Sequence, residues 1–132
     1  MCGIVAITGR DPVAGRLIEG LKRLEYRGYD SAGIAVIENG TLARRRAPGK
    51  IVNLQAAVEA DPTDGLIGIA HTRWATHGQP TLENAHPHSA GPVSIVHNGI
   101  IENYRELKSS LVAKGQSFHS ETDSEVIAQQ IA

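Results

Sequence analysis

The chain has 132 residues, a length typical of one domain, and its apolar content of 41% is ordinary for a globular protein. Its formal net charge of −1 argues against a nucleic-acid partner or an anionic membrane surface. The single cysteine excludes an internal disulfide framework, and no apolar run reaches membrane-spanning length. We therefore expect a cytoplasmic protein that binds neither nucleic acid nor membrane.

The first quarter of the chain predicts a strand, a helix and a loop. The apolar run over residues 2–8 is typical of a buried strand, which we expect to be central in its sheet. A helix should open at Asp11-Pro12, with Asp11 as its N-cap, and run to about Glu25. Residues 26–33 are punctuated by glycine and should form a loop.

Four further strands follow from apolar runs and turn signals. Residues 34–37 and 42–45 flank Asn39-Gly40, a strong hairpin signal. Residues 66–72 indicate another buried strand, and residues 92–97 indicate one more.

Three further helices are expected along the chain. One covers residues 51–60. A second is capped by Asn103, with a glutamate three residues later, and is stopped by Gly115. A third opens at Thr122 with Glu125 at its third position, and it is still running where the chain ends. Helices and short strands mixed in this way indicate packed sheets with helices outside.

Cys2 directly follows the initiator Met1. Removal of Met1 would place a thiol and a free α-amine on one residue. Because a terminal amine titrates near ~7.7–8.0, a useful fraction is unprotonated at neutral pH, where a general base works best. An N-terminal amine is a known activator of a neighbouring nucleophile. Position 2 therefore predicts a catalytic thiol, and the alternative is a small buried hydrophobic residue.

Polar and glycine-containing clusters follow the apolar elements, where rigid structure can present loop residues. There are four of them, at residues 26–31, 71–78, 97–103 and 120–125. The basic run at residues 44–46 has no interleaved aromatics, so a solvated strand face is favoured over a phosphate-binding patch. The pair His86 and His88 matches no closed zinc site in its spacing, and we expect no metal and no cofactor.

The N-terminal Cys2-Gly3-Ile4-Val5, followed by these four clusters in this order, resembles the glutamine amidotransferases that use an N-terminal cysteine. The stretches 24–33, 71–78 and 97–103 are most similar to the glucosamine-6-phosphate synthases, the glutamine–fructose-6-phosphate aminotransferases. The resemblance implies an α+β fold, the αββα sandwich of N-terminal-nucleophile hydrolases, with two antiparallel sheets flanked by helices. Residues 1–132 would form the N-terminal portion of that glutaminase domain, incomplete at the C-terminus and without the isomerase domain.

The resemblance also implies roles for five residues. Cys2 attacks the side-chain amide of glutamine, and Asn98 and Gly99 stabilise the oxyanion that forms. Arg73 binds the α-carboxylate of the substrate and Asp123 its α-ammonium. For residues 98–99 the alternative is a plain hairpin turn. Arg73 could instead form a surface ion pair, and Asp123 could serve only helix-terminus electrostatics.

Four more residues belong to the implied site. Trp74 lies on a loop that closes over glutamine, although a single tryptophan more often packs in a core. Thr76 and His77 line the same pocket. Arg27 lies near the nucleophile, where a cation would favour thiolate.

The expected function is glutamine hydrolysis that supplies ammonia for converting fructose 6-phosphate to glucosamine 6-phosphate. L-glutamine is the expected ligand of this chain, fructose 6-phosphate would bind only through the missing isomerase domain, and the full-length protein would be a homodimer. Two alternatives remain: a catalytically silent fragment or binding domain, and another amidotransferase such as the one that opens purine synthesis. Because the glutaminase part is incomplete, we expect an unpaired sheet edge and a partly uncovered core.

Overall fold

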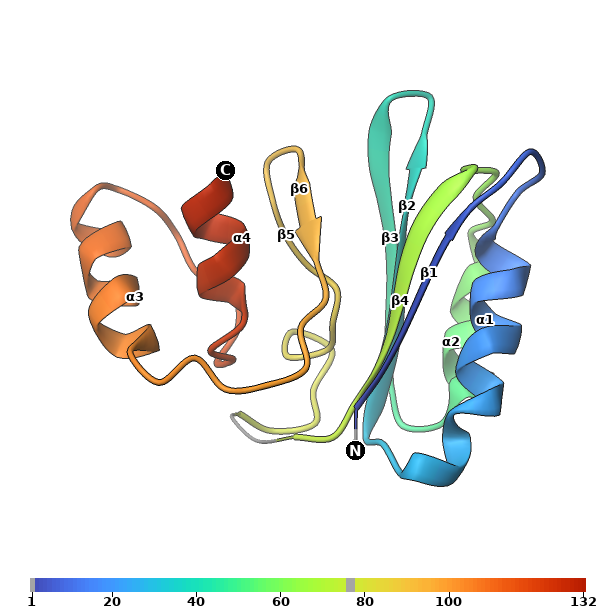
Figure 1. Cartoon of the computed structure of the whole chain (residues 1–132), viewed down its shortest axis with the longest axis horizontal. Coiled ribbons are helices and arrows are strands. Elements are labelled where there is room, and N and C mark those ends of the chain that lie inside the picture. The colour runs from blue at the N-terminus through green and yellow to red at the C-terminus, as the bar shows by residue number, and fades with distance from the viewer. Residues whose placement is uncertain (1, 76–77) are drawn as a thin grey trace.

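The computed structural model describes residues 2–75 and 78–132, apart from the side chain of Arg27. Its larger sheet is antiparallel and has the strand order β1-β4-β2-β3 (Figure 1). The strands are β1 (Gly3–Thr8), β2 (Ser31–Glu38), β3 (Thr41–Pro48) and β4 (Ile67–Arg73). Helices α1 (Ala14–Arg23) and α2 (Ile51–Ala60) cover one face of this sheet.

A second group of elements lies on the other side of the sheet. The short strands β5 (His88–Ala90) and β6 (Val93–Ile95) form an antiparallel hairpin. Helices α3 (Tyr104–Ala113) and α4 (Glu125–Ile131) lie beyond it, and α4 packs against the hairpin. Figure 1 thus shows helices, sheet, hairpin and helices in succession. No helix in the described part of the chain is long and apolar enough to cross a bilayer.

The main core lies between the four-stranded sheet and α1. Apolar side chains recur at helical spacing along α1, and Leu17 and Leu21 are fully buried. The alternation of β2 points Ile34 and Val36 toward them, and Ala70 of β4 joins the same cluster. This core holds the sheet rigid, and the opposite face of the sheet faces the hairpin and the candidate site.

That opposite face changes character along its length. At one end it carries polar side chains, including those of His71 and Arg73, which are buried. At the other end Ile37 and Ile67 are 45% and 51% exposed, above a shallow groove that reaches Val93 of β6. The apolar surface at this end is therefore only partly covered.

Three details of the secondary structure differ from the prediction. The strand β1 is at an edge of the four-stranded sheet and is not central. Helix α1 begins after Val13, not at Asp11, because the Val13 N–H donates to the carbonyl of Gly65 in the chain before β4. The stretch predicted as a loop holds a 3-10 turn, Glu25–Arg27, and the first residues of β2.

The two C-terminal helices also differ in how they begin. Asn103 is at the N-cap position of α3, but its side chain makes no capping hydrogen bond. Helix α4 begins at Glu125 and not at Thr122. The reason is that the Glu125 carboxylate accepts hydrogen bonds from the N–H groups of His119 and Ser120 and from the Ser120 hydroxyl, so it anchors the preceding loop.

The basic run on β3 is not a solvated face. Arg44 donates to the carbonyl of Pro87, and Arg46 donates to the carbonyls of Glu83 and Ala85. Burial lowers the pKa of Arg46 to about 10. These two guanidinium groups therefore join β3 to the segment that leads into the hairpin, which is also where the unpredicted strand β5 begins.

Candidate functional site

A cavity of about 250 Å³ opens where the two groups of elements meet, slightly below the ~300 Å³ at which ligand pockets typically start. Its walls come from segments far apart in the chain. Cys2 precedes β1, Arg73 and Trp74 lie at the end of β4, Gly99 follows β6, and Asp123 precedes α4. The fold therefore brings five of the predicted site residues to one place.

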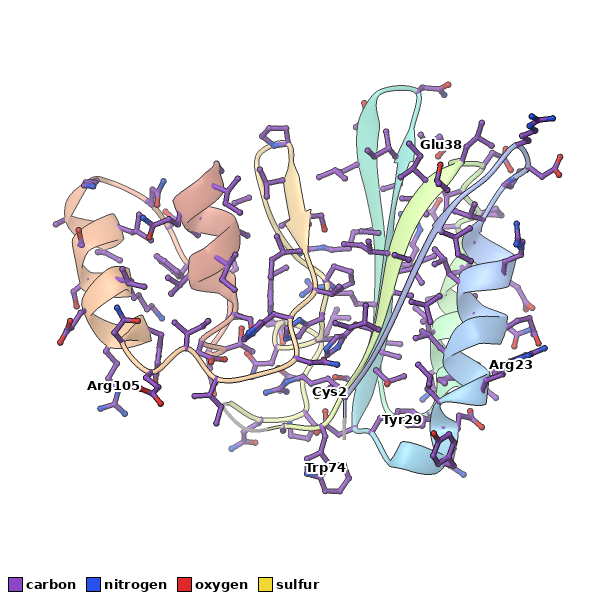
Figure 2. The ribbon with its side chains drawn as sticks, in the orientation of Figure 1. Cys2, Arg23, Tyr29, Glu38, Trp74 and Arg105 are labelled. Atoms are coloured by element: carbon purple, nitrogen blue, oxygen red, sulfur yellow. The ribbon has the colours of Figure 1, made fainter. Side chains whose placement is uncertain are left out.

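Cys2 is held at the cavity by the end of β4. The N–H of Trp74 donates to Sγ of Cys2 at 3.2 Å, and Sγ is 3.6 Å from the Trp74 carbonyl oxygen. The next residue, Gly3, donates its N–H to the hydroxyl of Thr72. Figure 2 shows Cys2 and Trp74 close together at one end of the sheet. The thiol is thus fixed against a strand, although β1 is an edge strand.

Asn98 and Gly99 approach Cys2 from the other side of the cavity. The side-chain amide of Asn98 donates from Nδ2 to the carbonyl oxygen of Cys2 at 3.2 Å. Gly99 has φ of +149°, and a Cβ there would meet Nε2 of His97 at 3.0 Å. The position therefore requires glycine, and residues 98–99 are not the turn of a hairpin, since the β5–β6 hairpin ends before them.

Arg73 is buried, with 3% of its surface exposed, so it does not form a surface ion pair. Its guanidinium donates to the carbonyls of Gly78 and Gln79 and lies 3.9 Å from a carboxylate oxygen of Asp30. Asp30 also accepts a 2.6 Å hydrogen bond from the N–H of Ala75. Together these contacts fix the chain that leaves β4 at the cavity wall.

Asp123 is also buried, beside the loop that carries Gly99. One of its carboxylate oxygens accepts a 2.6 Å hydrogen bond from the N–H of Ile101. The neighbouring Ser124 hydroxyl lies 3.0 Å from Nδ1 of His97. Asp123 therefore belongs to the cavity wall, and its contacts join the start of α4 to the loop after β6.

For the other predicted site residues the structure gives less information. The side chain of Trp74 is 55% exposed, so it is not a core tryptophan. Thr76 and His77 lie outside the described residues, and so does the side chain of Arg27. Their predicted roles stay predictions.

Three buried histidines form a stack behind the cavity. The rings of His71 and His86 are 4.1 Å apart and nearly parallel, and His88 contacts His86 edge-on at 4.5 Å. Burial lowers the pKa of His71 to about 4 and that of His88 to about 3, and it lowers the pKa of His86 as well. All three are therefore neutral at pH 7. No group of three metal-ligating side chains is found among the residues that were placed.

Four further residues contact predicted site residues or line the cavity and were not predicted from the sequence: Asp30, His71, His97 and Ser124. For His71 a signal was present. Side chains two apart on a strand share a face, so β4 puts His71 on the same face as Arg73. Asp30 and Ser124 lie within the polar clusters at residues 26–31 and 120–125, but no spacing rule predicts their contacts, because these cross between distant segments.

Comparisons with known proteins place the chain among similar sequences. A family model described as "Glutamine amidotransferase domain" matches residues 70–132. A glutamine–fructose-6-phosphate aminotransferase (isomerizing) of Rhizobium meliloti is 63% identical over the whole chain, and one of Caulobacter vibrioides is 61% identical over 99% of it. The chain spans 22% of the length of each of these two relatives.

Solved structures match the fold as well. The glutamine phosphoribosylpyrophosphate amidotransferase of B. subtilis has a TM-score of 0.81 and 28% identity, over 99% of this chain and 29% of that one. A structure described as the allosteric regulatory enzyme of purine biosynthesis has a TM-score of 0.80 at the same identity and coverage. The chain therefore corresponds to the N-terminal glutamine amidotransferase part of the glutamine–fructose-6-phosphate aminotransferases.

Proposed function

We propose that this chain hydrolyses the side-chain amide of glutamine with Cys2 after removal of Met1. One observation carries the proposal: Asn98 and Cys2, 96 positions apart, meet in a hydrogen bond beside the 250 Å³ cavity. A thiol, an amide donor and charged side chains for both ends of an amino acid then surround one space. This set suits acyl transfer from an amide.

The chemistry needs only the chain and water. The α-amine of Cys2 takes the thiol proton, and sulfur attacks the amide carbon, whose oxygen becomes an oxyanion. Nδ2 of Asn98 and the N–H of Gly99 stabilise that charge, and one such donor is typically worth ~3–4 kcal/mol. The ammonium form of the amine returns the proton to the leaving nitrogen. Ammonia departs and leaves a thioester, which water hydrolyses to glutamate and free Cys2.

The two charged side chains at the cavity suit the ends of a free amino acid. Arg73 would bind the α-carboxylate, because the planar guanidinium matches the geometry of a carboxylate and its bonds to the carbonyls of Gly78 and Gln79 hold it at the cavity wall. Asp123 would accept from the α-ammonium. A carboxylate has about four lone-pair sites, and that of Asp123 already accepts from the N–H of Ile101 and the hydroxyl of Ser124, which hold it at the cavity wall. Thr76 and His77 would line the same pocket, Trp74 would close over glutamine, and Arg27 would favour the thiolate.

The wider assignment concerns the protein to which such a chain belongs. We propose that residues 1–132 form part of an αββα glutaminase domain of the N-terminal-nucleophile type, in a longer homodimeric protein with an isomerase domain. Its ammonia would convert fructose 6-phosphate to glucosamine 6-phosphate. The identity of 63% to an aminotransferase of that name, against 28% to the purine-pathway structure, favours this acceptor. The 132-residue chain alone should release ammonia but not aminate fructose 6-phosphate.

The test is intact-mass spectrometry after incubation with a diazoketone analogue of glutamine. We expect loss of Met1, one added analogue residue, and its location on Cys2. The variant Cys2→Ala and the analogue shortened by one methylene are the controls, and both should give no adduct. Ammonia release from glutamine is measured on the same samples. Wild-type labelling that is equal with both analogues, or release by Cys2→Ala, would contradict the proposal.

A further inference from the structure

His71 touches one end of the Asn98 amide while Cys2 touches the other. Nε2 of His71 lies 2.7 Å from Oδ1 of Asn98, and Nδ2 of the same amide donates to the Cys2 carbonyl at 3.2 Å. The imidazole is completely buried on β4, whereas the Asn98 residue is exposed in the loop after β6. A rigid side chain of the sheet thus holds a side chain of a loop.

The chemistry of the partners fixes the direction of this hydrogen bond. A side-chain carbonyl oxygen can only accept, so Nε2 of His71 must carry the proton. Burial holds the imidazole neutral at pH 7, and Nδ1 then has no proton. Nδ1 has no hydrogen-bond partner among the described residues, and the ring stacks on His86. The side chain of Asn98 and the backbone of His97 are the hydrogen-bonding neighbours of this ring, and the 2.7 Å contact with Asn98 takes the Nε2 proton.

This bond decides which way the amide of Asn98 faces. Rotating the amide by half a turn would put Nδ2 against the Nε2–H of His71 and Oδ1 against the carbonyl oxygen of Cys2. Both contacts would then be repulsive, donor to donor and acceptor to acceptor. Without the imidazole only the 3.2 Å bond to the Cys2 carbonyl would hold this orientation, so the preference would be weaker.

We propose that His71 is a positioning residue for amide hydrolysis: its Nε2–H holds Oδ1 of Asn98, so that Nδ2 stays directed at Cys2. The inference rests on the proposed glutaminase function and deepens it. A donor that already accepts a hydrogen bond at its other end is also polarised toward stronger donation. His71 acts through Asn98 and does not itself touch substrate.

Steady-state kinetics of ammonia release from glutamine separates positioning from mere packing. His71→Leu removes the donor, and we expect kcat to fall about 10- to 100-fold, a part of what loss of an oxyanion donor costs, with KM changed less than about threefold. His71→Gln places an N–H donor near the original Nε2 and should recover most of the loss. The exposed His119→Leu is the matched control and should behave as wild type.

Two further measurements exclude a general loss of structure. In an Asn98→Ala background, His71→Leu should cause no additional fall in kcat, because both changes remove the same interaction. Alkylation of Cys2 by iodoacetamide forms no oxyanion, so its rate should stay within about twofold of wild type in His71→Leu. A further tenfold fall in the double variant, or no rescue by glutamine at position 71, would overturn the proposal.

The tautomer of His71 gives a readout that needs no activity. Long-range ¹H–¹⁵N correlation at pH 7 should show a protonated Nε2 and a bare Nδ1. An Nδ1–H tautomer or a doubly protonated ring would overturn the positioning role even in an active enzyme. A wild-type chain that releases no ammonia but shows the expected tautomer, with Asn98 side-chain shifts that change in His71→Leu, would support the orientation and count against the glutaminase function.

Discussion

The stack of His71, His86 and His88 should make folding sensitive to mild acid. Each ring is buried and neutral, and each has a pKa below the ~6.5 of an unfolded histidine. Because the unfolded chain binds protons more readily, stability is complete above about pH 6.5 and is lost as pH falls toward the folded-state pKa values. Lowering the pH from 7 to 5 is therefore the perturbation that tests this cluster.

The size of the effect follows from proton linkage. A histidine that stays neutral in the folded protein loses about 2 kcal/mol of stability between pH 7 and pH 5. The folded-state pKa values near 4 for His71 and 3 for His88 both lie below this window. With His86 the total is about 6 kcal/mol, which is comparable with the whole stability of a small domain, ~5–15 kcal/mol.

Urea unfolding followed by far-UV circular dichroism at several pH values measures this loss. The slope of the unfolding free energy against pH should correspond to uptake of about three protons at pH 5. His86→Phe and, separately, His88→Gln should each reduce that number to about two, and the exposed His119→Gln should leave it unchanged. Uptake below one proton, or an unchanged slope in both buried variants, would refute the reasoning.

Three other changes have defined outcomes. Gly33→Ala would drive a methyl group into the carbonyl of His86, so it should lower the unfolding free energy measured in urea by ~2 kcal/mol or more. Gly15→Ala, in open space on α1, is the control and should raise that free energy by up to ~1 kcal/mol. The Glu125 carboxylate accepts three hydrogen bonds, and Glu125→Gln would put an N–H donor where only an acceptor fits. The unfolding free energy should fall by about 1–3 kcal/mol in the same measurement. Unchanged stability would show that the three hydrogen bonds contribute little. Glutamine should alter the fluorescence of the exposed Trp74. No change at a saturating glutamine concentration would show that the ring does not contact the ligand.

Elements with local signals were predicted well from the sequence. Helix α2 has the predicted bounds, and the β2–β3 hairpin turns at Asn39-Gly40, because spacing and turn chemistry lie within each segment. The start of α1 was wrong because a distant partner, the carbonyl of Gly65, binds Val13. Strand β5 was not predicted, because three residues are too few to show the alternation of a strand. It is defined only by its pairing with β6.

The candidate site was also predictable only in part. The structure brings Cys2, Arg73, Gly99 and Asp123 around one cavity and bonds Asn98 to Cys2, while their chemical roles stay predictions. What the sequence could not reveal is which partners hold them. The bond between His71 and Asn98 joins residues 27 positions apart on different layers, and no spacing rule within one segment predicts such a contact.

The meeting of Asn98 with Cys2 has a consequence for how the protein folds. Closing a loop of almost a hundred residues costs more entropy than pairing β2 with β3 across a two-residue turn, so this contact should form late. It also depends on the docking of the hairpin layer onto the sheet layer, whereas the pairing of β1 with β4 does not. A partial opening that separates the layers would leave the four-stranded sheet intact and take the amide away from the thiol. Loss of the site would then precede loss of secondary structure.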